Sequence, residues 1–291
     1  MQHIATEYPA QWPDYELKDS GNGAKLERFA SYVVARPDPR VIWAPKLARD
    51  DWDKADASFV RTSSTTGQWN IRKPLPSPWV LTWQHLTFTL KPSDFKHVGI
   101  FPEQAVNWQW IGDLTANKPI RVLNLFAYTG GATMAAAASG ARVTHVDSVG
   151  ATIAWAKENI RLSGLETKPI RLIEDDVYKF VKREAKRGHV YDGIIMDPPR
   201  FGRGKKGEVF KLSGDLSNLV HACREIVSPA PVFFLMNGYT ADLSALAFRH
   251  LLEDCMKDFG GNTACGELGL MESAGKRILP SGIFARWTRG A

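Results

Sequence analysis

The chain has 291 residues, 44% of them hydrophobic and 23% charged, which is typical of a folded globular protein. The formal net charge is +6, and the three cysteines, Cys223, Cys255 and Cys265, form no C-x-x-C pair, which argues against a disulfide framework and favours a reducing compartment. The sequence shows neither an apolar signal-peptide core nor a run of roughly 18 apolar residues, so we expect a cytoplasmic, soluble protein without a membrane partner.

The N-terminal part, residues 1–117, is predicted to be a small, mainly β domain. Short apolar or aromatic runs with two-residue alternation are separated by turn residues, a pattern typical of strands. The runs expected to form strands are 31–39, 57–62, 69–73, 79–83, 86–90 and 97–102. We attribute the many tryptophans of this part to packing and strand pairing rather than to ligand stacking.

The remaining part, residues 118–291, alternates between strands and helices. Strands are expected at 121–126, 142–147, 170–175, 191–197 and 231–237, and helices at 131–140, 150–164, 177–188, 216–228 and 242–260. This alternation predicts an α/β fold with βαβ units and a parallel sheet. The last apolar segments, 267–271 and 282–287, have no helix between them and predict a closing antiparallel hairpin.

The net positive charge is confined to the second part. Residues 1–117 hold 13 basic and 13 acidic residues, so the whole excess lies in residues 118–291. A basic half favours a polyanionic partner such as RNA, whose phosphates attract it. A solubility surface explains so modest a charge about equally well.

Ligands of open α/β sheets bind beyond the carboxyl ends of the strands. The first strand of the second part ends in N-L-F-A-Y-T-G-G, residues 124–131. Gly130 and Gly131 allow a tight turn and a close approach of a ligand to the backbone. The spacing is not G-x-G-x-x-G, which weakens the case for a pyrophosphate at the following helix.

Acidic residues end the next two strands. Asp147 follows the second strand, where its carboxylate can accept hydrogen bonds from ribose hydroxyls, or can cap the following helix. The third strand ends in E-D-D-V, residues 174–177. Here Asp176 is the preferred acceptor for an adenine amino group, and it can also cap the next helix.

The fourth strand ends in M-D-P-P-R-F, residues 196–201, the most specific signal in the sequence. Pro198 and Pro199 lock φ and remove two backbone donors, which gives a rigid turn. This turn presents Asp197 as an acceptor, and Phe201 can stack on a planar substrate. A plain loop corner is the alternative interpretation.

Glycines and basic residues follow directly, in F-G-R-G-K-K-G-E-V-F-K, residues 201–211. We interpret this segment as a mobile, substrate-facing loop in which Arg203, Lys205 and Lys206 contact phosphates. A solvated surface loop is the competing interpretation.

The series L-N-L-F-A-Y-T-G-G, V-D, E-D-D-V-Y-K-F and Y-D-G-I-I-M-D-P-P-R-F resembles the class I S-adenosylmethionine-dependent methyltransferases. It is similar to the branch that contains the bacterial 23S ribosomal RNA methyltransferases acting on cytosine C5 and guanine N7. The resemblance covers roughly residues 97–240. The stretch K-H-V-G-I-F-P-E-Q-A-V-N-W, residues 96–108, looks like the segment that precedes the catalytic domain in that branch.

The resemblance implies a Rossmann-like sheet of seven strands with the last one antiparallel, S-adenosylmethionine as cofactor, RNA as partner and no metal. The implied cofactor site comprises Phe101, Gln104, Asn124, Phe126, Tyr128, Thr129, Gly130, Gly131, Asp147, Ser148, Asp176, Val177 and Asp197. The implied catalytic residues, which hold the acceptor, are Asp197, Pro198, Pro199 and Phe201. The substrate contacts expected around them are Arg200, Arg203, Lys205, Lys206 and Asn237.

One departure from this branch affects the chemistry. Cytosine-C5 enzymes carry a nucleophilic cysteine after the fifth strand, where this sequence has Gly238. C5 chemistry needs a covalent thiolate adduct, so we expect direct in-line transfer instead, with Asn237 bonding the base. Three alternatives stay open: a nicotinamide-dependent oxidoreductase, an RNA-binding or assembly module, and a methyltransferase of proteins. The oligomeric state is not predicted.

Overall fold

A computed structural model describes residues 4–10, 12–63, 66–94, 96–203, 209–239 and 243–290. The chain forms two compact units. Unit 1 comprises the described parts of Met1–Glu7, Val106–Leu268 and Gly282–Ala291, and unit 2 comprises those of Tyr8–Ala105 and Gly269–Ser281. Each unit therefore combines segments that lie far apart in the sequence, whereas the sequence prediction divides the chain once, after residue 117.

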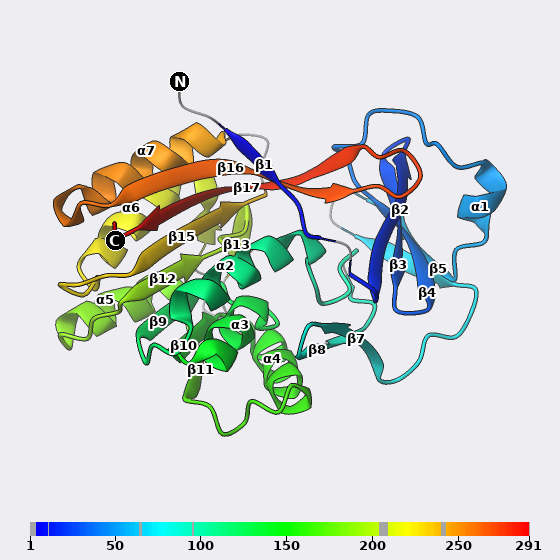
Figure 1. Ribbon diagram of the computed structural model, residues 1–291. Helices are drawn as coiled ribbons and strands as arrows, with labels where there is room; N and C mark the ends of the chain where they lie inside the picture. The colour runs from blue at the N-terminus through cyan, green and yellow to red at the C-terminus, as the bar shows by residue number, and fades with distance from the viewer. Residues whose placement is uncertain are drawn as a thin grey trace. The chain divides into compact units, whose positions relative to one another are not determined.

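Most of the largest sheet belongs to unit 1 (Figure 1). Within the described residues, its eight strands run in the order β1-β16-β17-β15-β12-β9-β10-β11. They are β1 (Ala5–Glu7), β9 (Arg121–Leu125), β10 (Arg142–Asp147), β11 (Ile170–Glu174), β12 (Gly193–Met196), β15 (Phe233–Gly238), β16 (Asn262–Met271) and β17 (Ile278–Thr288). Neighbours from β11 to β15 pair in parallel, and β17 pairs antiparallel with β15. The predicted Rossmann-like fold with an antiparallel last strand is confirmed, and β1 adds an eighth strand.

Helices cover both faces of this sheet (Figure 1). They are α2 (Ala105–Thr115), α3 (Gly131–Ser139), α4 (Gly150–Leu162), α5 (Val177–Lys186), α6 (Leu212–Arg224) and α7 (Ala245–Met256), the last followed by the 3-10 helix η2 (Lys257–Phe259). Alternate strand residues face opposite sides, as the two-residue period of a strand requires. Leu123 and Leu125 pack with residues of α5, α6 and α7, whereas Val122 packs with residues of α2 and α3.

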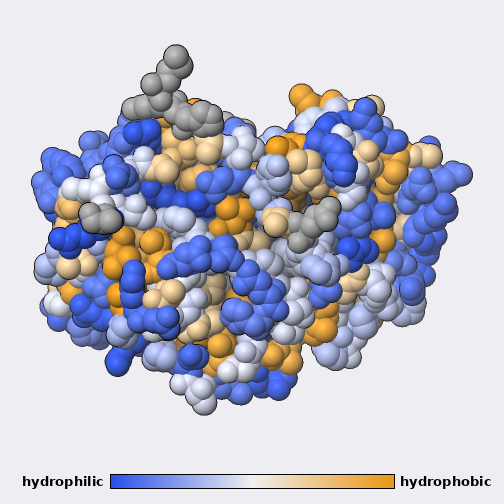
Figure 2. Space-filling model, in the orientation of Figure 1, coloured by the Kyte–Doolittle hydropathy of each residue, from blue (hydrophilic) through white to orange (hydrophobic). Residues whose placement is uncertain are grey.

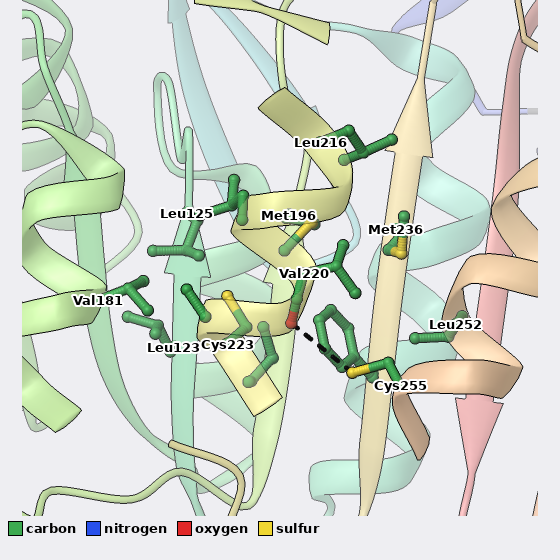
Figure 3. Packing of buried hydrophobic residues seen from close by; sticks show 14 of the residues in the cluster. Leu123, Leu125, Val181, Met196, Leu216, Val220, Cys223, Met236, Leu252 and Cys255 are labelled. Atoms are coloured by element: carbon green, nitrogen blue, oxygen red, sulfur yellow. Dashed lines mark hydrogen bonds between the residues drawn. The ribbon is translucent and has the colours of Figure 1, made fainter. Parts of the chain in front are cut away.

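The core on the α5–α7 side is drawn in Figure 3, where Met196 and Met236 from the sheet lie among aliphatic side chains of the helices. Cys223 and Cys255 belong to this core, and the Cys255 thiol donates a hydrogen bond to the Val220 carbonyl oxygen at 3.7 Å. Burial raises the pKa of the Cys223 thiol and raises the pKa of Cys255 to about 11. Both residues are therefore neutral packing groups at pH 7.

Unit 2 is rich in strands. A five-stranded sheet of described residues contains β2 (Tyr15–Gly21), β3 (Ala24–Phe29), β4 (Tyr32–Pro37), β5 (Ala57–Arg61) and β6 (Gly67–Ile71). The unit also holds the hairpin β7 (Trp79–Trp83)–β8 (Leu86–Leu90), helix α1 (Arg49–Asp53) and the 3-10 helix η1 (Pro102–Gln104). The small β-rich N-terminal domain is thus confirmed.

One predicted strand of this part is wrong. Residues 97–101 form no strand, and Pro102 begins η1. The physical reason lies in two residues of the run. Gly99 has a φ of 101°, which interrupts extended backbone, and Pro102 fixes φ at a helix start. Four of the other predicted runs contain β4, β5, β7 and β8, and the run 69–73 overlaps β6, which begins at Gly67.

The basic segment 201–211 starts and ends in two short strands, β13 (Phe201–Arg203) and β14 (Val209–Lys211), which pair antiparallel. Residues 204–208 lie outside the described residues. No helix in the described part of the chain has the length and apolarity needed to cross a membrane. On the face drawn in Figure 2, apolar residues occur in small groups between hydrophilic ones.

Candidate functional site

The strand ends of unit 1 are in register at the carboxyl edge of the sheet. Leu125 of β9 is paired with both Val146 of β10 and Met196 of β12. Met196 is also paired with Met236 of β15. Paired residues of neighbouring strands lie about 5 Å apart, so the residues that follow them share one edge: Phe126, Asp147, Asp197 and Asn237. Four separate sequence motifs thus meet in space.

The loop that follows β9 has an unusual backbone. Phe126, Tyr128 and Gly130 have φ angles of 56°, 48° and 91°. Left-handed conformation suits glycine, but at other residues it costs about 1–3 kcal/mol and persists only where the surrounding structure imposes it. Two strained side-chain-bearing residues within three positions therefore mark a loop whose shape the fold enforces, as is common at functional sites.

Three hydrogen bonds from neighbouring elements fix this loop. A carboxylate oxygen of Asp147 accepts from the Tyr128 backbone N–H at 2.9 Å. The Ala127 N–H donates to the Val146 carbonyl oxygen at 3.1 Å. From α4, the fully buried Asn159 side chain donates to the Thr129 carbonyl oxygen at 2.9 Å.

Gly131 begins α3 in contact with an indole ring. A Cβ atom at this position would lie 2.6 Å from Cζ2 of Trp108. Trp108 itself, on α2, is 5% exposed and has no room to retreat without disturbing the core. The second glycine of the motif is therefore required by packing, and the first by its backbone angle.

A series of buried, hydrogen-bonded polar side chains lies beneath the same loop. The Asn124 amide donates to the Thr133 hydroxyl at 2.9 Å, and that hydroxyl lies 3.0 Å from Nδ1 of His145. Burial lowers the pKa of His145 to about 3, so the imidazole is neutral. Asn124, which the sequence assigns to the cofactor, is 2% exposed, and its side-chain amide donates to Thr133 in this series.

The Asp147 carboxylate accepts hydrogen bonds from both the start of α4 and the loop after β9. Oδ1 accepts from the Val149 N–H and from the Thr152 hydroxyl, both at 3.0 Å, at the start of α4. Oδ2 accepts the single bond from Tyr128. A carboxylate oxygen can accept two hydrogen bonds, so Oδ2 retains capacity for a ligand hydroxyl. Ser148, the next residue, is partly exposed.

Asp176 is the N-cap of α5. Its side chain accepts from the Lys179 N–H at 2.9 Å, so the capping role expected from the sequence is confirmed. Val177, the first residue of α5, is 4% exposed and packs in the core. The contact of these two residues with adenine stays a prediction.

The proline turn follows β12. Pro198 is buried, whereas Pro199, Arg200 and Phe201 are exposed, Phe201 by 50%. The turn leads into β13, and the ring of Phe210 in its partner β14 lies 5.2 Å from the ring of Phe126. The hairpin therefore lies beside the strained loop.

Other predicted site residues are placed differently. Asn237 is 2% exposed, and its side-chain Oδ1 accepts from the Asn107 side-chain amide at 2.9 Å. Phe101 and the 7% exposed Gln104 belong to unit 2. Arg203 contributes backbone to β13, and the predicted phosphate contacts Lys205 and Lys206 lie outside the described residues.

Sequence reasoning missed the residues that support the loop from behind: Trp108, Thr133, His145 and Asn159. Asn159 had a detectable signal, because it shares one helical face with Trp155, Ala156 and Ile160, all buried. A polar residue on an otherwise apolar helix face implies a specific partner. Trp108 gave no such signal, since its contact with Gly131 joins two separate elements.

A family model described as S-adenosylmethionine-dependent methyltransferase matches residues 48–258, more than half of the chain. The chain belongs to this family. A solved structure of a SAM-dependent methyltransferase from Agrobacterium tumefaciens is 40% identical, with a TM-score of 0.92 over 98% of this chain and 94% of that one. A more distant structure, solved in complex with SAH, is 20% identical with a TM-score of 0.71 over 92% and 72% of the two chains, and shows the fold alone.

Two curated relatives carry ribosomal RNA in their names. Ribosomal RNA large subunit methyltransferase K of Neisseria meningitidis is 28% identical over 162 residues, 55% of this chain and 45% of the relative. Ribosomal RNA large subunit methyltransferase K/L of Shewanella baltica is 34% identical over 153 residues, 52% and 21% of the two chains. The chain spans less than half the length of these relatives.

The predicted enzyme class and its cofactor, S-adenosylmethionine, are confirmed by these matches. The nicotinamide-dependent alternative is thereby excluded. The roles of individual site residues stay predictions.

Proposed function

We propose that this chain transfers the methyl group of S-adenosylmethionine to a base of cytoplasmic RNA, with ribosomal RNA as the preferred class. The observation that carries the proposal is the meeting of the strained loop, Asp147 and the proline turn at one sheet edge. The names of the two bacterial relatives support RNA as the substrate, and the basic charge of the second half of the chain is compatible with it.

The described residues at this edge fit an adenosyl ligand. Asp147 retains acceptor capacity on Oδ2 for a ribose hydroxyl. The backbone from Phe126 to Gly131 is held in a fixed shape for such a ligand, because Gly130 and Gly131 pack closely against Ala156 and Trp108 from behind. Asp176 and Val177, at the start of α5, are assigned to the adenine.

The proline turn holds the acceptor base in this proposal. When bound, S-adenosylmethionine supplies a methyl group already activated as a sulfonium, and a base nitrogen can accept it through its lone pair without a covalent enzyme intermediate. The Asp197 carboxylate accepts a hydrogen bond from an N–H of the base and takes the proton that this nitrogen loses. Phe201, half exposed on the same turn, stacks on the base and fixes its plane.

The cysteines support a mechanism without a thiolate. Cys223, Cys255 and Cys265 are at most 4% exposed, and burial raises the pKa of the first two. A thiol that is kept neutral and out of reach is a poor nucleophile. At Gly238, where C5 enzymes of the similar branch have their cysteine, a Cβ atom would lie 2.7 Å from Cζ of Phe248. Nitrogen is therefore the acceptor atom in this proposal.

The deciding experiment is transfer of radiolabelled methyl groups by the full chain to RNA and protein fractions from cells that lack this gene. We expect label in the large ribosomal RNA, followed by mapping to one methylated nitrogen. Label in protein would favour the protein methyltransferase. RNA binding without any transfer would favour the assembly module, and a methyl group on cytosine C5 would contradict the mechanism without a cysteine.

A further inference from the structure

A pocket opens at the amino edge of the unit 1 sheet, the edge opposite to the candidate site. Its volume is about 480 Å³, and all its lining residues belong to unit 1. Five of the residues that line it can carry a positive charge: Arg121, Arg142, Lys168, Arg171 and His189. Neither the motifs nor the predicted reaction uses any of them.

Strand register explains why these cations gather. Arg121 of β9 is paired with Arg142 of β10, and Thr144 of β10 is paired with Arg171 of β11. Paired residues of parallel strands, and residues two apart within a strand, project from the same face of a sheet. The three arginines therefore project together from three adjacent strands, an arrangement that costs folding energy through like-charge repulsion.

The carboxylates in this region compensate only part of that charge. Glu184 is 1% exposed and is held by the Tyr191 hydroxyl at 2.7 Å, by Nδ1 of His189 at 2.9 Å and by Arg187 at 3.4 Å. Asp192 forms an ion pair with Arg121 at 3.8 Å. Arg142 and Lys168 are exposed and form no ion pair with any described residue.

We propose that this pocket and its rim, Arg121, Arg142, Lys168 and Arg171, form a docking surface for the phosphodiester backbone of the RNA substrate. The inference rests on the proposed function. A polyanion is the partner that relieves the repulsion between the arginines, because each bound phosphate compensates one of them. Contacts of this kind position the nucleic acid without reading its sequence.

The position of the surface suits a long substrate. Strand β9 spans five residues, so its two ends are about 13 Å apart. β11 is the last strand of the sheet on this side. An RNA can therefore pass around the β11 edge, with one segment at the amino edge and its target base at the carboxyl edge. A small free substrate cannot make both contacts.

The test compares two double variants that remove the same charge. Arg142→Gln/Lys168→Gln neutralises two cations of the rim, and Lys257→Gln/Arg289→Gln neutralises two exposed cations elsewhere in unit 1. Binding of a large-subunit ribosomal RNA transcript is measured over a range of salt concentrations. We expect the rim variant to bind roughly three- to tenfold more weakly, with a salt slope lower by about 2 because two phosphate contacts are lost. Affinity for S-adenosylmethionine should not change.

A variant that keeps both charges controls for misfolding. Arg142→Lys/Lys168→Arg keeps both charges and should bind RNA like the unmodified chain. Equal affinity and salt slope in the two neutralised variants would overturn the docking surface while leaving the proposed function intact. No RNA binding by the unmodified chain would overturn both. Tight binding of inorganic phosphate, without a difference between the variants on RNA, would identify a free-anion site and also overturn it.

Discussion

Two aspartates at the carboxyl edge of the sheet differ in what they already bind. Asp147 accepts three hydrogen bonds from its own unit and keeps capacity on one oxygen, whereas Asp197 lies at the start of the rigid proline turn. We assign the first to the cofactor and the second to the acceptor base. The two roles separate in a kinetic experiment.

Asp197→Ala should lower kcat by about 10²–10⁴-fold, the usual contribution of a positioned acid or base. The dissociation constant of S-adenosylmethionine should change little. Asp147→Ala is the matched variant, and it should weaken cofactor binding by about tenfold, or 1.4 kcal/mol. Calorimetry and single-turnover rates measure the two effects. Parallel losses in both variants would show that the assignment of separate roles is wrong.

The side-chain space of Gly131 is occupied by the buried ring of Trp108. Gly131→Ala places a methyl group 2.6 Å from Cζ2 of Trp108, so we expect a loss of about 1–3 kcal/mol in the free energy of unfolding and weaker cofactor binding. Gly214→Ala, in α6, is the control, because an added Cβ meets no atom within 4 Å. It should stabilise the chain by up to about 1 kcal/mol. Urea unfolding followed by tryptophan fluorescence distinguishes the two.

At the scale of elements, α4 acts as a support for the strained loop. Its buried Asn159 donates to the Thr129 carbonyl oxygen. In Asn159→Ala the loop loses this donor, and we expect about tenfold weaker S-adenosylmethionine binding with kcat at saturation nearly unchanged. Lys157→Ala, on the exposed face of the same helix, should leave both values as they are. A lower melting temperature with unchanged cofactor affinity would reduce Asn159 to a packing role.

Much of unit 1 could be predicted from the sequence because its elements keep a single periodicity over their length. The segment 142–147, for example, is predicted as a strand and is β10 with the same bounds. The strand ends then located the candidate site by a general rule of α/β sheets. The order of the elements and the ends of the strands depend on residues close together in the sequence, so both can be predicted from the sequence.

Other elements could not be predicted because their stability depends on distant partners. β2 was missed, since Asp19 and Ser20 in it are polar yet fully buried. Asp19 accepts from the Leu47 backbone N–H at 2.9 Å and from the Trp52 indole N–H at 3.1 Å, partners well outside the strand. Helix α2 was missed as well, so the contact of Trp108 with Gly131 could not be predicted. The clustering of the arginines at the amino edge could not be predicted either, because it depends on the register of the strands.

At the scale of the whole molecule, the buried ring of His145 contributes to the dependence of stability on pH. The pKa of His145 is lowered to about 3 by burial, whereas a histidine in an unfolded chain titrates near about 6.5. Between these values the unfolded chain binds a proton that the folded chain excludes. Stability therefore falls as pH falls from about 6.5 towards 3, by up to about 1.4 kcal/mol per pH unit for this one group.

We expect His145→Gln to flatten this dependence by about one proton between pH 6 and pH 4.5. The free energy of unfolding from urea titrations at several pH values measures it. His221→Gln, which changes an exposed ring on α6, is the control and should keep the slope of the unmodified chain. An identical slope in all three proteins would contradict the role given to His145.

The pairing of β1 has a consequence for biosynthesis. Ala5 lies beside Gly266 in the sheet, so β1 leaves the ribosome long before its partner strand β16. Until β16 has emerged, β1 has no neighbour in the sheet, and unpaired strands invite association with other chains. During translation, β1 must therefore join the sheet of unit 1 after β16 has emerged. A nascent chain halted before β16 leaves β1 unpaired, so we expect it to bind chaperones.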